Sequence, residues 1–165
     1  MPFKHIKTPV YELFGELGIQ YEKHDHEAIF TMEEIHNANL DPDGYIAKNL
    51  FLRDGNGKRH MLVTVSDGKT PDLKVLRNIF QSSRLSFGSE ERLMDRLGLT
   101  KGSVSPMGLI NDKDNAVEFY FDKDLLNREL IGIHPNHNTS TVFLKPADLI
   151  RAIEHTGHKV IFIEI

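Results

Sequence analysis

The sequence predicts a single-domain α/β protein in which helices surround one mixed β-sheet. Strand patterns are mostly separated by helix patterns, an order that favours helices packed on a sheet containing parallel strands. One stretch departs from that order, because Asp54-Gly55-Asn56-Gly57 is typical of a hairpin turn, which makes its two flanking strands antiparallel. A chain of 165 residues that is 39% hydrophobic and 27% charged fits one globular domain over residues 1–165.

The first part of the chain predicts two helices and a short strand. Thr8-Pro9 starts the first helix, with proline at its first position, and Gly18 ends it. Its apolar residues recur at helical spacing: Val10, Leu13, Phe14 and Leu17. Residues 20–24 are predicted to form a short strand, and the capping box Thr31-Met32-Glu33-Glu34 starts a second, short helix.

The rest of the chain predicts strands and helices in turn. The two hairpin strands cover residues 44–53 and 60–66. A helix then begins at Thr70-Pro71, and its expected inward side chains are Leu73, Leu76, Ile79 and Phe80. Ser89 caps the next helix, which ends at Gly98 and carries Leu93, Met94 and Leu97. Strands follow at 116–121, 130–134 and 141–144, then a helix over 146–156 and a last strand over 159–165.

Composition excludes several classes of protein. The absence of cysteine excludes a disulfide framework, thiolate chemistry and cysteine-ligated zinc. No apolar run approaches the length of a membrane span and no signal-peptide pattern opens the chain, so we expect a cytoplasmic protein with no membrane partner. The formal net charge of -4 argues against non-specific binding to DNA or other nucleic acid.

The charge is nevertheless uneven along the chain. Residues 48–101 hold 11 Lys+Arg and 6 Asp+Glu, which gives this segment a charge of +5 inside an acidic protein. The basic segment includes Lys48, Arg53, Lys58, Arg59, Lys69, Lys74, Arg77 and Arg84. Such charges usually form a solvated surface, and they can also attract a polyanion to one part of the molecule.

Lys48 is the most informative polar residue of the predicted strands. It lies among Ile46, Leu50 and Leu52 on one side of a strand whose other side is also apolar, a pattern typical of a central strand covered on both sides. An unpaired buried ammonium is costly, so Lys48 must find a partner, reach a cleft or extend to the rim of the sheet. We favour a lysine in a ligand-binding cleft.

The histidines divide into two groups. His24-Asp25-His26 resembles a metal site only weakly, because no other ligand stands at a recognisable spacing, and capping or surface roles are favoured. The run from Gly132 to Thr139 concentrates histidine and asparagine where a strand ends and the chain must turn. A plain turn and a cluster of ligand-orienting donors both explain that run.

The stretch KGSVSPMG, residues 101–108, suggests a site without matching a nucleophile motif. It lacks the spacing of the G-x-S-x-G nucleophile elbow and that of the P-loop. Gly102 is free to adopt unusual backbone angles and Pro106 stiffens the turn. The backbone N–H groups between them are suited to hold a carbonyl or oxyanion, and a plain turn explains the residues equally well.

Four stretches taken together resemble one known family. They are Tyr45-Ile46-Ala47-Lys48-Asn49-Leu50-Phe51-Leu52, Arg84-Leu85-Ser86-Phe87, the segment from Gly102 to Asp112, and Ile133-His134-Pro135-Asn136-His137-Asn138. Their order and spacing are similar to those of the YbaK/prolyl-tRNA synthetase-associated editing superfamily. Within it, the chain most resembles the free-standing prolyl-tRNA editing proteins of the ProXp-ala or PrdX type, over nearly its whole length.

The resemblance implies an aminoacyl-tRNA deacylase that acts in trans on mischarged tRNA, with Ala-tRNA(Pro) as the expected substrate. It implies no metal and no organic cofactor, and a water molecule organised chiefly by the free ribose hydroxyl of the substrate. The expected partner is the acceptor end of the tRNA, with transient contact to prolyl-tRNA synthetase or an elongation factor.

The resemblance also assigns roles to individual residues. It implies that the backbone of the loop holds the aminoacyl carbonyl, through Gly102, Ser103, Val104, Ser105 and Pro106. Lys48 would anchor the terminal adenosine or its phosphate, next to Asn49, while His134 lines the aminoacyl pocket with Asn136 as a helper. Arg53 and Arg84 match basic positions that touch the acceptor stem. Ile46 and Val104 are the expected pocket walls, because they adjoin these motifs.

Three alternatives stay open from the sequence. The first is a deacylase with another preference, such as Cys-tRNA(Pro), although the Arg84-Leu85-Ser86-Phe87 run and the extended loop favour alanine. The second is a catalytically silent module that binds tRNA or a synthetase, which would have no need to retain Lys48, Gly102 and Pro106 together. The third and weakest makes Ser103 or Ser105 a covalent nucleophile.

Overall fold

The larger sheet of the protein has five strands and mixed directions. The computed structural model describes residues 8–29, 31–37, 41 and 44–165. The strand order is β4-β2-β3-β5-β8, which are Ser86–Phe87, Ala47–Arg53, His60–Ser66, Val117–Asp122 and Val160–Ile163. β2 and β3 form the predicted antiparallel hairpin, whereas β3–β5 and β5–β8 are parallel pairs. The mixed α/β class is therefore confirmed.

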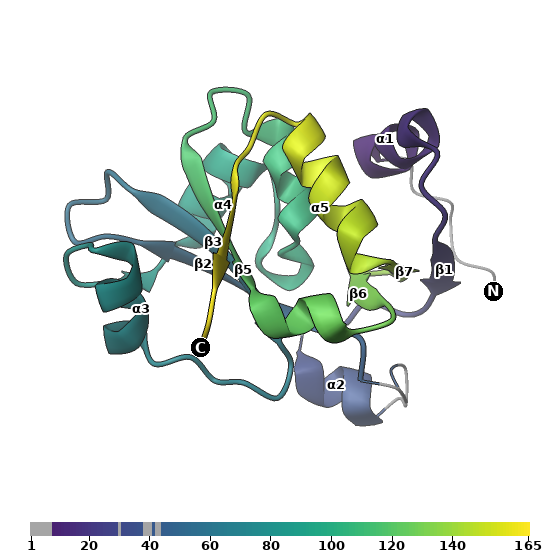
Figure 1. The fold of residues 1–165 in the computed structure, drawn as a ribbon, viewed down its shortest axis with the longest axis horizontal. Coiled ribbons are helices and arrows are strands. Elements are labelled where there is room, and N and C mark those ends of the chain that lie inside the picture. Colours follow the sequence, from purple (N-terminus) through teal and green to yellow (C-terminus); the bar gives the residue numbers. More distant parts are fainter. Residues whose placement is uncertain (1–7, 30, 38–40, 42–43) are drawn as a thin grey trace.

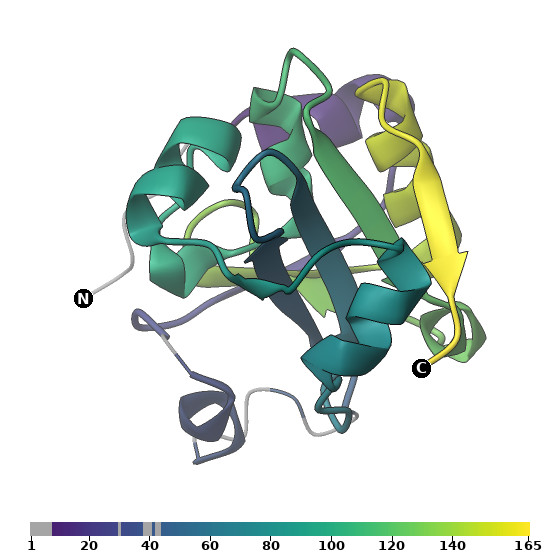
Figure 2. The same ribbon diagram turned by 90° about the vertical axis from the view of Figure 1, so that its left-hand side faces the viewer.

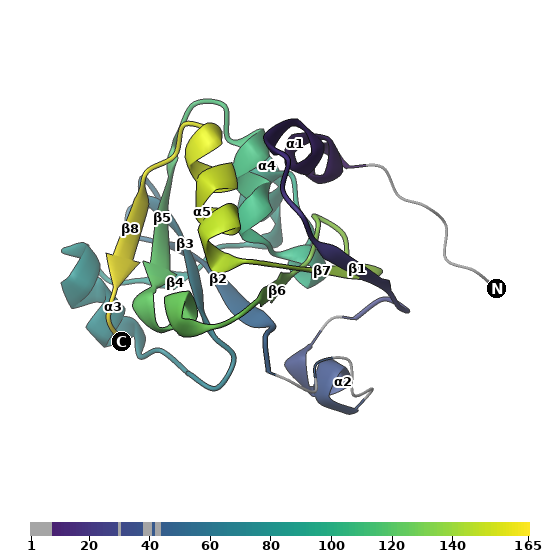
Figure 3. The same ribbon diagram turned by 45° about the vertical axis from the view of Figure 1, so that its right-hand side comes forward.

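A second, smaller sheet lies beside the beginning of β2 (Figure 3). Its order is β1-β7-β6, antiparallel throughout, from Glu22–Asp25, Ser140–Leu144 and Ile131–Ile133. A single bridge between Ile46 and Gly132 joins the two sheets, where the Gly132 amide donates to the Tyr45 carbonyl at 2.8 Å. A Cβ on Gly132 would lie 2.8 Å from both Ile46 and Phe143, so only glycine allows this approach. The strands thus divide between two sheets and do not form the single sheet expected from the sequence.

Helices cover both faces of the larger sheet (Figure 1). The long helices are α1, α3, α4 and α5, over Pro9–Leu17, Leu73–Phe80, Glu90–Leu97 and Pro146–His155. α2 is a short helix over Met32–Asn37, and three 3₁₀ segments follow α4: η1, η2 and η3, over Lys101–Ser103, Pro106–Asn111 and Lys123–Asn127. α3 lies on one face of the sheet, over β3 and β5 (Figure 2), and α5 lies on the other.

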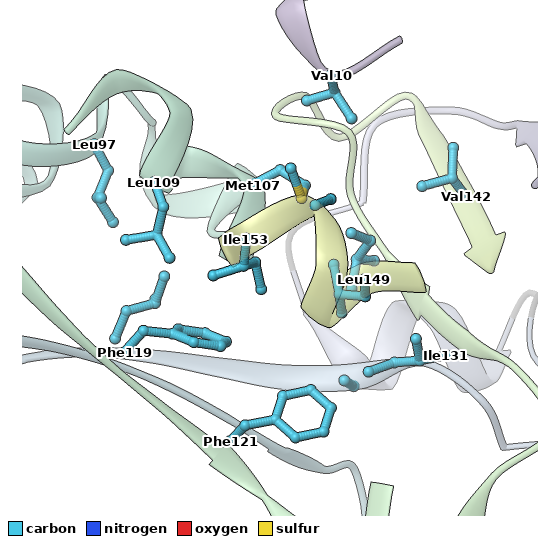
Figure 4. Close-up of a cluster of buried hydrophobic side chains, with 14 of the residues drawn as sticks. Val10, Leu97, Met107, Leu109, Phe119, Phe121, Ile131, Val142, Leu149 and Ile153 are labelled. Atoms are coloured by element: carbon cyan, nitrogen blue, oxygen red, sulfur yellow. The ribbon is translucent and has the colours of Figure 1, made fainter. Parts of the chain in front are cut away.

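The alternation of side chains along β3 and β5 produces two apolar cores. The core on the α5 face unites α1, α4, α5 and η2 with the sheet, and Figure 4 shows Leu149 and Ile153 of α5 over Phe119 and Phe121 of β5. The core on the α3 face contains Met61 and Val63 of β3, together with Leu76 and Phe80 of α3 and other residues. Both faces of the central strands are consequently covered, in keeping with the burial of every residue of β3.

Local sequence signals set most element ends correctly. Gly18 and Gly98 end α1 and α4 in the left-handed conformation, each with φ 65°, and the Ser89 hydroxyl accepts a hydrogen bond from the Arg92 amide at 3.1 Å. The first strand begins at Glu22, two residues later than predicted. Ile79 was expected to point inward but is 36% exposed, because Leu76 and Phe80, with the partly buried Leu73, form the contact stripe of α3. Within the described ranges, every helix is too short or too polar to cross a membrane.

Candidate active site

A cavity of about 150 Å³ opens where the first half of β2 meets the η1 loop, β6 and β7. Its lining includes six residues singled out from the sequence: Ile46, Lys48, Asn49, Gly102, Val104 and His134. β3 pairs with β2 over its full length, but β4 pairs only with Leu52 and Arg53. β2 is therefore covered on one edge only at its end, and the cavity occupies the open part of that edge.

Lys48 lines the cavity and is fixed by a backbone carbonyl. Its Nζ atom donates a hydrogen bond to the Lys69 carbonyl oxygen at 2.9 Å, and its side chain is half-buried. An ammonium has three N–H donors, so two remain for a ligand in the cavity. Lys48 thus has both of the properties expected of it, since it has a hydrogen-bonding partner and reaches a cleft.

Asn49 lies on the opposite side of β2 from Lys48 and also reaches the cavity. The Thr64 hydroxyl of the neighbouring strand donates to the Asn49 Oδ1 atom at 2.6 Å. This contact fixes the orientation of the amide, because its oxygen is the accepting atom. The Nδ2 group is then the donor that Asn49 presents to its surroundings.

Some residues of the KGSVSPMG loop line the cavity, and others are buried away from it. Gly102 and Val104 line the cavity, whereas Ser103, Ser105 and Pro106 are buried away from it. The Ser105 hydroxyl accepts from the Met107 amide at 3.1 Å and caps η2, and the Ser103 hydroxyl accepts from Thr100 Oγ1 at 3.3 Å. Both serines therefore have structural hydrogen bonds.

Two expectations about the loop backbone need correction. Gly102 was expected to use the freedom of glycine, but it lies inside η1 and is not among the described glycines with positive φ. The Ser103 amide donates to the Thr100 carbonyl at 2.9 Å, because this bond closes the 3₁₀ turn. The candidate donors to a substrate carbonyl are thus reduced to the amides of Gly102 and Val104, because Ser105 is fully buried and does not line the cavity.

His134 presents a hydrogen-bond acceptor to the cavity. Its Nδ1 atom lies 3.2 Å from the Ser140 carbonyl, which can only accept, so the proton of the neutral ring is on Nδ1 and Nε2 carries a lone pair. Burial lowers the pKa of His134, and nearby His26 lowers it further, while the bond to Ser140 opposes the shift. The neutral ring is the form favoured near neutral pH.

Asn136 does not line the cavity and instead shapes the turn after β6. It has a φ of 67°, in the left-handed region that asparagine tolerates, and its Nδ2 group donates to the Met107 carbonyl at 3.2 Å. Its Oδ1 atom is buried with no hydrogen-bond partner in the described structure. Asn136 therefore connects this turn to η2, next to the KGSVSPMG loop.

Several cavity residues were not assigned to the site from the sequence. Ile29, Ile35, Lys101, Ile133 and Thr141 all line the cavity. The apolar residues and Thr141 are ordinary occupants of strands and core positions, whereas Lys101 could have been found as the basic neighbour of Gly102. His26 was expected to be a surface or capping residue, but it is buried and its Nε2 atom lies 2.8 Å from the Thr141 hydroxyl. Across the described segments, no three His, Cys, Asp or Glu side chains are grouped to hold a metal.

Arg53 and Arg84 are not brought to the cavity. Arg53 follows Lys48 by five strand residues, which places the two Cα atoms about 17 Å apart. It bonds the Asp54 carbonyl at 3.3 Å, and Arg84 is exposed close to the same end of β2. Two other charges of the basic segment are engaged within the protein, Arg59 with Glu118 at 2.7 Å and Lys69 with Asp122 at 2.8 Å.

Comparison with known proteins gives one consistent picture. A family model described as an aminoacyl-tRNA editing domain matches residues 26–152. A prolyl-tRNA editing protein, ProX, of Acetoanaerobium sticklandii is 41% identical, over 96% of this chain and 97% of its own length. The prolyl-tRNA synthetase associated domain-containing protein 1 of Mus musculus is 30% identical, over 99% of this chain and 98% of its own.

Solved structures share the fold. A proposed trans-editing enzyme for prolyl tRNA synthetase has a TM-score of 0.70 with 20% identity, over 98% of this chain and 99% of the other. The crystal structure of a hypothetical protein, APE2540, has a TM-score of 0.74 with 17% identity, over 94% and 98%. At these identities the likeness concerns the fold alone.

Proposed function

The chain belongs to the aminoacyl-tRNA editing domain family and is an aminoacyl-tRNA deacylase, and from this premise we propose that it removes alanine from mischarged Ala-tRNA(Pro) in trans. The relative that is 41% identical over nearly both full lengths is a prolyl-tRNA editing protein, which favours tRNA(Pro) as the carrier. We further propose that residues 1–165 act as one editing domain.

The observation behind the choice of alanine is a small cavity with a branched apolar wall. Its volume, about 150 Å³, is below the usual range of roughly 300–1,000 Å³ for ligand sites that enclose a whole drug-sized molecule. Branched aliphatic side chains form its apolar wall: Ile29, Ile35, Ile46, Val104 and Ile133. We propose that this wall leaves room for a methyl side chain and overlaps with the larger proline ring, which is how editing sites select by size.

The polar groups of the cavity suit ester hydrolysis without a protein nucleophile. Water adds to the ester carbonyl carbon, and the intermediate collapses with departure of the ribose oxygen, which takes up a proton and leaves free alanine and tRNA. The amides of Gly102 and Val104 are the candidate donors to the developing oxyanion. Lys48 can anchor the terminal adenosine or its phosphate, with Asn49 beside it.

His134 enters this proposal as an acceptor. Because its Nδ1–H is directed to the Ser140 carbonyl, its Nε2 can orient a donor of the substrate or the attacking water but cannot itself donate while the ring is neutral. The ribose hydroxyl beside the ester supplies the remaining organisation of the water. Asn136 supports this wall through its bond to Met107.

Arg53 and Arg84 are proposed to contact phosphates of the acceptor stem, about 17 Å along β2 from the cavity. The protein would act in the cytoplasm, where charged tRNA is used, with transient contact to prolyl-tRNA synthetase or an elongation factor. The mischarged tRNA acceptor end is its substrate in this proposal.

A panel of charged tRNAs tests the assignment. Purified protein should release alanine from Ala-tRNA(Pro) rapidly and leave Pro-tRNA(Pro) largely intact, and Lys48→Ala should reduce the rate strongly. Rapid loss of cysteine from Cys-tRNA(Pro) with Ala-tRNA(Pro) untouched would overturn the choice of alanine. No release from any ester of tRNA(Pro) would overturn the assignment to tRNA(Pro).

A further inference from the structure

The carbonyl that holds Lys48 belongs to a residue that is itself held from three directions. Lys69 lies in the segment between β3 and α3, and its carbonyl oxygen accepts from Lys48 Nζ at 2.9 Å. Its own Nζ atom lies 2.8 Å from Asp122 Oδ2, 2.6 Å from Asp124 Oδ2 and 2.8 Å from the Ile165 carbonyl. These three acceptors match the three N–H donors of an ammonium.

Asp122 is the buried partner among the three. Its side chain is 1% exposed at the end of β5, whereas the Asp124 side chain is 65% exposed. Asp122 Oδ1 also accepts from the Asp124 amide at 3.0 Å, and Oδ2 lies 3.4 Å from the Ser66 amide at the end of β3. The buried Asp122 carboxylate is thus paired with Lys69 and hydrogen-bonded at both oxygens. This arrangement fixes the position of the Lys69 side chain, because separating the two charges would leave the carboxylate unpaired in the interior.

The Lys69 backbone therefore has little freedom to move. Its side chain attaches the segment after β3 to β5, η3 and the last residues of the chain, and its carbonyl faces the cavity residue Lys48. Burial alone would lower the pKa of Lys69, but the bonds to Asp122 and Asp124 outweigh it and the net pKa is raised, so Lys69 stays charged near neutral pH.

We propose that Lys69 and Asp122 are positioning residues of the editing site, which hold the carbonyl that orients the Lys48 ammonium toward the substrate. The inference rests on the proposed role of Lys48 in deacylation. A flexible lysine side chain loses conformational entropy when it binds a ligand, because several of its bonds can no longer rotate. A fixed carbonyl restricts these bonds before the substrate arrives, so less entropy is lost on binding.

Asp122→Asn tests the coupling because it removes the charge and keeps an oxygen that can accept from the Asp124 amide. We expect kcat/KM for Ala-tRNA(Pro) to fall roughly tenfold to a hundredfold, as for other losses of positioning. In the Lys48→Ala background the same change should have an effect of less than about twofold, since the residue it orients is gone. Equal losses in both backgrounds would overturn the inference, because a general structural defect acts with or without Lys48.

Glu164→Gln is the matched control. It also converts a carboxylate to an amide, in the exposed ion pair with Lys123 at 3.2 Å close to the same end of the chain, and should leave kcat/KM unchanged. If Asp122→Asn fails to fold, the double variant Lys69→Met/Asp122→Asn removes both charges and leaves neither unpaired. Thermal melting establishes which variants are folded.

Chemical labelling gives a readout that does not require deacylation. The bond to the Lys69 carbonyl restricts the motion of Lys48, whose amine must lose a proton and reach the reagent before it can attack. Under brief treatment with an N-hydroxysuccinimide ester, we expect Lys48 acylation, measured by mass spectrometry relative to exposed Lys74, to rise severalfold in the Asp122 variant. An unchanged ratio would overturn the inference, even in a protein that failed the test of its proposed substrate.

Discussion

Replacing Ser105 with alanine separates a structural serine from a catalytic one. The Ser105 hydroxyl is fully buried and accepts from the Met107 amide at 3.1 Å, where it caps η2. Loss of such a cap costs about 0.5–2 kcal/mol, and a buried amide left without a partner costs about 1–3 kcal/mol. We therefore expect Ser105→Ala to lower the free energy of unfolding by about 1–2 kcal/mol and to retain most of the deacylation rate.

The assay pairs urea denaturation with single-turnover deacylation of Ala-tRNA(Pro). Ser103→Ala is the comparison, because its hydroxyl bonds only the Thr100 hydroxyl at 3.3 Å and should matter less for stability. A Ser105→Ala protein of unchanged stability that has lost activity would refute this reasoning. A trapped acyl-enzyme in any serine variant would point to the covalent mechanism that the buried position of Ser105 opposes.

Three further predictions concern pH, packing and salt. Burial lowers the pKa of His134 in the folded protein, so the unfolded chain binds more protons as pH falls through about 6.5. The free energy of unfolding should therefore decline below that pH, by at most about 1.4 kcal/mol per pH unit. His134→Gln should reduce this slope in denaturation measured at several pH values, and His60 and His137, whose pKa values are also lowered, contribute in the same direction. Gly132→Ala should destabilise the protein by about 1–3 kcal/mol, because its Cβ would lie 2.8 Å from Ile46, and a normal melting curve would contradict the packing argument. Arg84→Ala should raise KM for Ala-tRNA(Pro) and weaken the dependence of KM on salt, and an unchanged salt dependence would exclude Arg84 from phosphate contact.

Local signals in the sequence predicted the elements better than their assembly. Gly18, Ser89 and Gly98 each act on the backbone next to them, so their caps are visible in the sequence. The bridge between Ile46 and Gly132 joins residues far apart in the chain, and no local pattern indicates that it divides the strands between two sheets. Exposed Ile79 shows the same limit, because helical spacing defines a stripe but not its width.

The same distinction applies to the candidate site. The sequence indicated Lys48 because a charge within an apolar strand needs an explanation, but the partner that fixes it is a carbonyl, which any residue would provide. Thr141 and Ile35 line the cavity without any chemical peculiarity, so they could not be distinguished from core residues. The role of Asn136 was ambiguous in the sequence because asparagine is common both in turns and in ligand sites. Its φ of 67° identifies it as a turn residue.

The incomplete pairing of β2 connects the fold to the proposed function. β4 covers only the end of β2 that carries Arg53, so the beginning of the strand keeps an open edge where Lys48 and Asn49 face a cavity. A longer β4 would pair with that edge and leave no room for an aminoacyl group beside Lys48. Under the proposed function, the shortness of β4 allows one strand to position the aminoacylated end of the tRNA at its beginning and to present a basic residue at its end, about 17 Å away. If both ends contact one tRNA, changes at Lys48 should act mainly on kcat and changes at Arg53 mainly on KM. Lys48 would position the terminal adenosine beside the ester in the cavity, whereas Arg53 lies about 17 Å away along the strand.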